Sequence, residues 1–132
     1  METKKIELEE GKSITVWRMN NGFKSDWNDK SIIISASEGP TDPKTGKATT
    51  KQERRVSNGN YRIYGMIYGI LSTEGYNISE PKDLEIGLSE TELDLRKRFV
   101  RTLDGRIADR VWNEILEINK VDEEKTESLK KN

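Results

Sequence analysis

Cysteine and histidine are both absent from the 132 residues of this chain. Without cysteine there are no disulfides, thiolate metal sites or cysteine nucleophiles, and without histidine there is no Ser-His-Asp chemistry. General acid–base catalysis would have to use carboxylates, lysine or tyrosine. We therefore expect a protein that is not an enzyme, with no catalytic residues, no metal and no cofactor.

Long apolar runs are missing as well. The longest, residues 63–71, is interrupted by glycines and is far shorter than the roughly 20 residues that span a bilayer. The first ten residues, METKKIELEE, lack the apolar segment of a signal peptide. The sequence predicts a soluble protein of the cytoplasm (of the host cell, if the source is viral) with no membrane partner.

Charge of one sign does not dominate, because 23 Lys and Arg stand against 24 Asp and Glu for a net charge of −1. No uniform field therefore attracts a polyanion. Charge is instead segregated along the chain: residues 44–62 sum to +5, residues 96–110 to +4, and residues 114–127 to −4. We expect basic patches on a hairpin and on one helix, and an acidic C-terminal tail that offers a site for a protein partner.

Alternation of apolar and polar residues predicts strands at residues 4–10, 13–19, 31–37 and 47–57. The Pro- and Gly-containing residues 38–47 form a turn between the last two. Residues 58–73 carry apolar side chains at helical spacing nearly all round, which predicts a buried helix. Gly65 and Gly69 lie four apart in it, and we expect them to allow a close backbone approach.

A second helical region begins at the capping box of Ser89 and Glu92. Apolar residues then recur every four residues from Leu95 onward, which predicts one long amphipathic helix or two helices broken near Asp104. We expect this region to form a homodimer. The fold class is α+β, with an N-terminal antiparallel sheet of about four strands, a buried central helix and the long C-terminal helix. Residues 1–121 form one domain, and residues 122–132 a disordered charged tail.

The candidate functional stretch is residues 14–35, where three aromatic residues stand among cations at a predicted turn. Flat aromatic rings and cations together suit single-stranded nucleic acid, because rings stack on bases and cations follow the phosphates. The candidate binding residues are Trp17, Arg18, Phe23, Lys24, Trp27 and Lys30, with Lys44, Lys47, Lys51, Arg54 and Arg55 of the basic hairpin. Packing of the rings in the core is the alternative interpretation, and for Trp27 the polar neighbours favour an exposed turn.

Other functions have weaker support. The segment DPKTGK lacks the spacing of a phosphate-binding loop, and the carboxylates of Glu38, Asp42 and Glu53 are too loosely spaced to indicate a nuclease. The same aromatics could be hot spots of a protein-interaction module, for example a viral factor that binds and inhibits a host protein. A third hypothesis makes residues 89–103 and 106–120 a helix-turn-helix reader of duplex DNA, with TLDGR as the turn. In the basic helix 89–103, Arg96, Lys97 and Arg101 are expected to pair with neighbouring acids.

Residues 30–71 resemble the coactivator/Whirly-type single-stranded DNA-binding domains. The likeness lies in a strand, a turn with Asp42, Pro43 and Gly46, a basic strand and a supporting helix. It covers about a third of the chain, and the long C-terminal helix departs from that pattern. In size and composition the chain is also similar to the small cysteine-free single-stranded DNA-binding proteins of archaeal rod-shaped viruses. Both resemblances imply a DNA-binding protein that acts on single strands.

Overall fold

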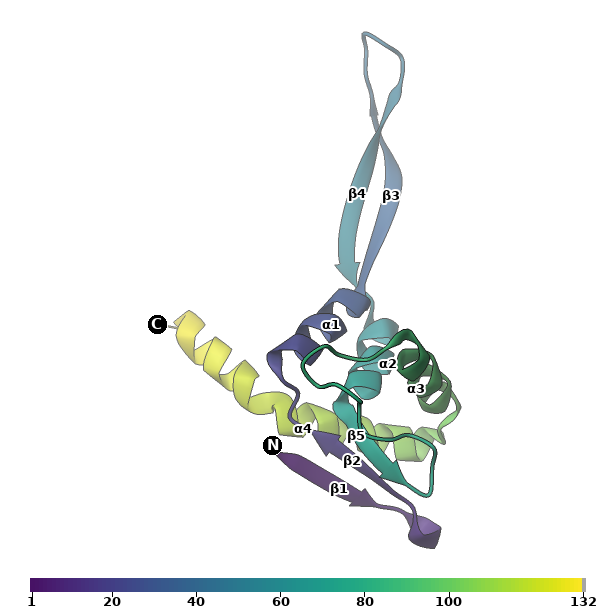
Figure 1. Ribbon diagram of the computed structural model, residues 1–132. Coiled ribbons are helices and arrows are strands. Elements are labelled where there is room, and N and C mark those ends of the chain that lie inside the picture. The colour runs from purple at the N-terminus through teal and green to yellow at the C-terminus, as the bar shows by residue number, and fades with distance from the viewer. Residues whose placement is uncertain (132) are drawn as a thin grey trace.

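Three short strands form an antiparallel sheet with β2 (Ser13–Trp17) between β1 (Thr3–Glu7) and β5 (Ile70–Glu74) (Figure 1). The computed structural model describes the backbone of residues 1–131 and the side chains of residues 1–34, 39–48, 50 and 52–120. A short 3-10 turn, η1 (Glu9–Gly11), joins β1 to β2, and both Glu10 and Gly11 adopt positive φ there. Ile6 pairs with Ile14, and both are buried.

Four helices pack around this sheet. They are α1 (Asn21–Ser31), α2 (Asn58–Gly69), α3 (Glu90–Thr102) and α4 (Gly105–Lys131). The central helix α2 contacts α1, α3 and α4, while α4 also packs against β1 and β2. Because added Cβ atoms at Gly65 and Gly69 would clash with Trp112 and Ile115, the expected close approach at these glycines is confirmed.

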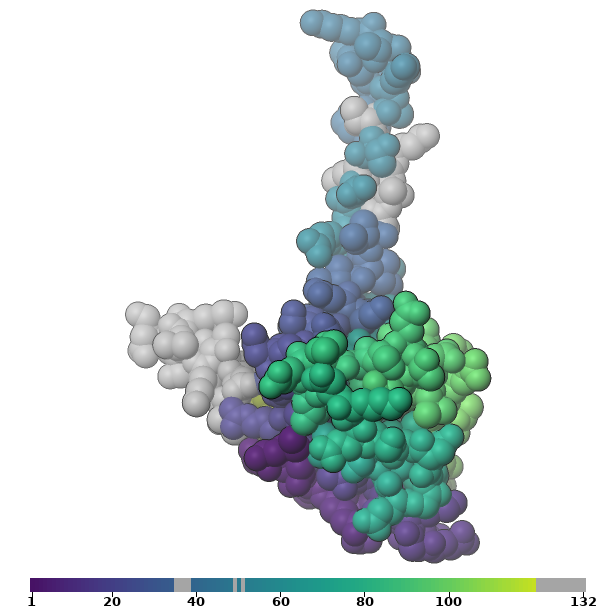
Figure 2. Space-filling model, viewed as in Figure 1, coloured from purple at the N-terminus to yellow at the C-terminus, as the bar shows by residue number. Residues whose placement is uncertain are grey.

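The remaining two strands, β3 (Ile32–Thr41) and β4 (Ala48–Val56), pair only with each other in a separate antiparallel sheet. We call this two-stranded sheet with its turn, residues 32–56, the ribbon. Figures 1 and 2 show it projecting as a narrow arm from the body, which is formed by the helices and the three-stranded sheet. Its root is closed by a hydrogen bond of 2.8 Å from the Ser57 amide to the Ser31 carbonyl.

The α+β class and the long C-terminal helix are confirmed, but the expected single four-stranded sheet is wrong. The four predicted strands divide between two sheets, and a fifth, β5, completes the first sheet. The predicted helix over residues 58–73 ends at Gly69, because Ile70 and the residues after it pair with β2. Such pairing between distant segments leaves no mark on local periodicity.

The turn predicted around Trp27 is also wrong, since residues 21–31 form α1. Asn20 caps this helix: its side-chain oxygen accepts a hydrogen bond of 2.9 Å from the Phe23 amide. The many Asn, Asp, Ser and Gly residues favour a turn locally. The helix nevertheless forms, because Phe23 and Trp27 lie four residues apart and both reach the core.

One long helix and two helices were the predicted alternatives for the C-terminal region. The structure has two helices, with the break between Thr102 and Gly105. The capping box of Ser89 and Glu92 is confirmed in both of its hydrogen bonds. The backbone of α4 continues to Lys131. The side chains of residues 122–132 lie outside the described residues. The disorder predicted for this tail stays a prediction.

Candidate nucleic-acid interface

The turn at the tip of the ribbon is organised by Asp42. Its carboxylate accepts a hydrogen bond of 2.8 Å from the Lys44 amide, and its carbonyl accepts one of 2.8 Å from the Gly46 amide. The Asp42 amide donates to the Lys47 carbonyl at 2.9 Å. Gly46 has φ of +70°, a conformation that glycine adopts without a Cβ penalty. The turn expected at Asp42, Pro43 and Gly46 is therefore confirmed.

The ribbon exposes the side chains of four of its five predicted binding cations, Lys44, Lys47, Arg54 and Arg55. The side chain of Lys51 lies outside the described residues. Arg54 pairs with Ile34 and Arg55 with Ile33, so the two guanidinium groups point to opposite faces of the ribbon. The ribbon thus presents positive charge at its tip and on both faces near its root.

The three aromatic residues of the candidate site are in the core, which contradicts the predicted exposure of Trp27. Trp17, Phe23 and Trp27 are only 2%, 1% and 7% exposed. Both indole N–H groups are satisfied internally: Trp17 donates to the Tyr68 carbonyl and Trp27 to the Tyr61 carbonyl, each at 2.8 Å. Rings buried in this way offer no free face to a nucleic-acid base.

The aromatic core is continuous across three helices and a strand. Phe23 meets Trp17 edge-on, with ring centroids 5.0 Å apart. Trp27 stacks on Tyr61 at 4.7 Å, and Trp112 of α4 meets both of these rings edge-on. Edge-to-face aromatic pairs stabilise a fold by about 0.5–1.5 kcal/mol beyond their buried area. The clustering of aromatics that suggested a binding surface therefore serves packing.

The cations predicted beside these aromatics do not form one patch with the ribbon. Arg18 is half-buried and lies 3.8 Å from the Glu2 carboxylate. Lys24 is half-buried on the second turn of α1. Lys30 is exposed in the last turn of α1, directly before the ribbon, with its ammonium 6.0 Å from the Tyr64 ring centroid. Of the three, only Lys30 lies next to the ribbon in the chain.

Arg96, expected to pair with acids on a wet helix face, is instead 3% exposed. Its guanidinium donates to the main-chain carbonyls of Ile67, Ile70, Leu71 and Ser79. Burial lowers its pKa to about 10, against the opposing charge of Glu92, so the group remains charged at neutral pH. The ion pair on the surface of α3 is made instead by Arg98, which was not among the residues expected to pair, with Asp94 at 3.0 Å.

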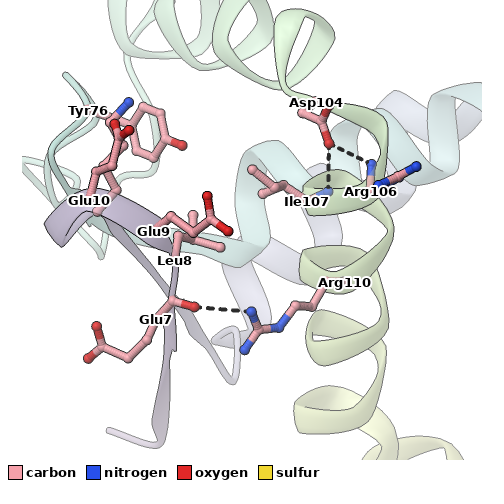
Figure 3. Close-up of a pocket in the computed structure, with 10 residues that line it drawn as sticks. Glu7, Leu8, Glu9, Glu10, Tyr76, Asp104, Arg106, Ile107 and Arg110 are labelled. Carbon is pink, nitrogen blue, oxygen red and sulfur yellow. Dashed lines mark hydrogen bonds between the residues drawn. The ribbon is translucent and has the colours of Figure 1, made fainter.

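A pocket of about 980 Å³ lies where the β1–η1 segment faces the start of α4, at the other end of the body from the ribbon (Figures 1 and 3). Three glutamates line its strand side, and Arg106 and Arg110 its helix side. Arg110 donates to the Glu7 carbonyl at 3.1 Å. Asp104 caps α4 by accepting from the amides of Arg106 and Ile107. These residues are far apart in sequence, so no local motif identified the pocket.

The described residues contain no group of three or more His, Cys, Asp or Glu side chains arranged to hold a metal ion. None of their helices is both long enough and apolar enough to cross a membrane.

Comparison of the chain with protein-family models, with curated proteins and with solved structures finds no match.

Proposed function

We propose that the protein binds nucleic acid through the ribbon, without catalysing a reaction. The observation that supports this proposal is the projecting two-stranded sheet with Lys44, Lys47, Arg54 and Arg55 exposed on it. Lysine and arginine side chains that neutralise phosphates supply most of the sequence-independent affinity for nucleic acid. A projecting arm can bring several such side chains to one ligand at once.

Charge separates the ribbon from the rest of the molecule. Residues 32–56 contain five Lys and Arg against three Asp and Glu, a net charge of +2, whereas the whole chain carries −1. The remainder of the chain is therefore at −3. A polyanion is attracted by the arm and repelled by the average field of the body, which orients the encounter. This orientation would be lost at high salt, where charges more than a Debye length apart are screened.

The shape of the ribbon favours a duplex groove. Paired strands lie about 4.7–4.9 Å apart, and the major groove of B-form DNA, about 12 Å wide, admits a two-stranded ribbon. Single-strand recognition requires stacking surfaces, and the three rings predicted to provide them are buried. We therefore propose double-stranded DNA as the preferred ligand and treat single strands as the competing ligand.

The test is fluorescence anisotropy with a labelled 20-base-pair duplex and a single strand of equal length, at several salt concentrations. We expect salt-sensitive binding that is tighter for the duplex. In the double variant Arg54→Gln/Arg55→Gln the log–log salt slope should fall in magnitude by about 1.8, because each lost phosphate contact contributes about 0.9 on duplex DNA.

The matched control is Lys4→Gln/Lys5→Gln, which also removes two adjacent cations from a strand. Lys4 and Lys5 lie on β1 and pair with Glu114 at 2.7 Å and Glu74 at 3.3 Å. This control should bind as the wild type does. Tighter binding to the single strand would overturn the duplex preference, and no binding to either ligand at low salt would overturn the proposal.

A protein partner is the second candidate, because Ile34 and Val56 are each 60% exposed. Val56 pairs with Ile32, and Ile34 lies two residues further along the same strand, so both side chains lie on one face. An exposed apolar face of this kind can serve as a protein contact. This candidate would replace nucleic-acid binding if the anisotropy experiment shows no binding.

A further inference from the structure

Two lysine ammonium groups converge on one tyrosine ring beneath the ribbon. The Nζ atoms of Lys30 and Lys97 lie 6.0 and 5.7 Å from the centroid of the Tyr64 ring. These are cation–π distances, at which the ring attracts and orients each cation. Tyr64 is half-buried, and its ring also stacks against Tyr68 with centroids 6.5 Å apart. We call Lys30, Tyr64 and Lys97 the root patch.

The root patch lies where the ribbon enters the body. Lys30 is in the last turn of α1, which β3 follows directly, and Tyr64 is in α2, which begins two residues after β4 ends. Lys97 is supplied by α3, which packs against α2. Figure 1 shows α1, α2 and α3 together at the base of the ribbon. Two ammonium groups are thus placed next to the arm by helices that are distant from one another in sequence.

Within the part of the chain whose side chains are described, neither ammonium of the root patch has a direct ion pair. Among the described side chains, no carboxylate lies within 4.0 Å of either lysine, whereas Lys4, Lys5, Arg62 and Arg98 all have such partners. Asp29 precedes Lys30 in the chain, and Asp26 and Asp29 act on the ring that stacks against Tyr64: burial, with the charges of Asp26, Tyr64 and Asp29, raises the pKa of Tyr68 to about 12. Two like charges beside one ring, without a paired acid, leave the site able to accept an anion.

We infer that the root patch is a second phosphate-binding point, which extends the contact of a bound nucleic acid from the ribbon onto the body. This inference rests on the proposed function. Lys30 and Lys97 would each contact a phosphate, and Tyr64 acts as a positioning residue that holds both ammonium groups. The nucleic acid would then lie across the base of the ribbon as well as along its strands.

The experiment repeats the anisotropy measurement, with the same labelled duplex, for Lys30→Gln and Lys97→Gln singly. We expect each variant to reduce the magnitude of the log–log salt slope by about 0.9. The matched control is Lys12→Gln, because Lys12 also lies over a tyrosine, with its Nζ 5.2 Å from the Tyr76 centroid. Lys12 adjoins the β1–β2 turn, at the opposite end of the body from the ribbon (Figure 1), so its loss should leave the slope unchanged.

A variant of opposite sign provides an independent readout. Asp29→Asn removes an acid next to the root patch, so we expect tighter binding of the duplex at low salt and no difference at high salt. Wild-type slopes in both lysine variants, with unchanged affinity in Asp29→Asn, would overturn the inference. If Arg54→Gln/Arg55→Gln still weakened binding in that case, the proposed function would stand without the root patch. An absence of duplex and single-strand binding by the wild type overturns both.

Discussion

Arg96 lies at the junction of α2, β5 and the loop before α3, with its charge directed at carbonyl groups and not at a carboxylate. The carbonyls of Ile67 and Ile70 belong to the end of α2, where the helix dipole is negative and the last carbonyls have no partner within the helix. A guanidinium has five donors in a planar fork, which lets it satisfy several carbonyls together. The side chain thus completes the C-terminus of α2.

Replacing Arg96 by Met should lower the free energy of unfolding by about 3–5 kcal/mol, the range for removing one member of a buried charged arrangement. The cost arises because the buried carbonyls of Ile67, Ile70 and Leu71 and the part-buried carbonyl of Ser79 lose this donor. Urea unfolding would measure it. The control, Arg98→Met on the exposed side of α3, should change stability by less than about 0.5 kcal/mol. Equal losses in the two variants would contradict this role of Arg96.

Gly65 lies where α2 packs closely against Trp112 and Trp27. A Cβ atom there would clash with the Trp112 ring and lie 2.9 Å from Cζ2 of Trp27. We expect Gly65→Ala to destabilise the protein by about 1–3 kcal/mol through overpacking, although alanine favours a helix by about 1 kcal/mol. In the same helix, the nearest atom to an added Cβ at Gly59 is 4.0 Å away. Gly59→Ala should therefore leave the thermal midpoint unchanged or raise it.

Glu92 links stability to pH at the start of α3. Desolvation by burial raises its pKa. This effect is outweighed by hydrogen bonds from the Ser89 and Lys82 amides and the Ser89 hydroxyl, together with the charge of Arg96, so the pKa is lowered overall. A carboxyl with a lowered folded-state pKa stabilises the protein above its unfolded pKa, and this contribution is lost as pH falls through the folded value.

For Glu92→Gln we therefore expect a loss of stability at pH 6 that shrinks as the pH approaches 3, measured by urea unfolding at both values. Glu90→Gln is the control, because Glu90 is exposed in the same first turn of α3 and experiences the same helix dipole. A destabilisation by Glu92→Gln that stayed constant between the two pH values would show that the carboxylate charge is not its source.

At the scale of elements, the ribbon and the body are nearly independent. The two strands of the ribbon hydrogen-bond to each other and to neither edge of the three-stranded sheet. Among the described side chains, the buried apolar core is drawn from residues outside the ribbon. We therefore expect the body to fold without the outer part of the ribbon.

Replacing residues 35–53 by Asn-Gly tests this independence. The replacement joins Ile34 to Arg54, which face each other in the paired strands, and Asn-Gly favours the two-residue hairpin turn. We expect circular dichroism to give a thermal midpoint within a few degrees of the wild type, and anisotropy to show strongly weakened nucleic-acid binding. Loss of the cooperative unfolding transition would mean that the ribbon contributes to folding of the body.

At the scale of the whole molecule, the predicted homodimer remains untested by the structure of one chain. The apolar stripe on which it was based is covered in part within the chain: Val111 and Ile115 are fully buried, whereas Leu95 and Leu116 are 40% and 36% exposed. Asn119 accepts from the Met19 amide at 3.0 Å and donates to the Trp17 carbonyl at 3.3 Å. Much of the stripe is thus explained by packing against the chain's own sheet.

We therefore expect light scattering to give a mass near the 15.2 kDa of one chain over the accessible concentration range. A mass near twice that value would support the dimer instead. The variant Leu116→Glu then becomes informative, because Leu116 is 36% exposed on α4. If α4 forms the dimer, this charge in an apolar contact should restore the monomer.

Local sequence by itself determined the features that depend on neighbouring residues. Alternation placed four of the five strands, the Ser89 and Glu92 pattern placed the start of α3, and Asp42 with Gly46 placed the turn of the ribbon. The spacing of Gly65 and Gly69 indicated a close approach, which the structure shows. Caps, turns and strand alternation are interactions over a few residues, so they can be recognised in a single sequence.

The tertiary structure alone decided which side chains are buried and which strands pair. The polar neighbours of Trp27 in the sequence are compatible both with an exposed turn and with helix α1. Its contacts with Tyr61 and Trp112, which are 34 or more residues away in the sequence, place it in the core. In the sequence, nothing distinguishes Arg96 from the basic residues beside it. In the structure, its guanidinium is surrounded by carbonyls of α2 and β5. Burial is set by contacts between segments distant in sequence, and for this reason the predicted aromatic residues are in the core while the predicted cations of the ribbon are exposed.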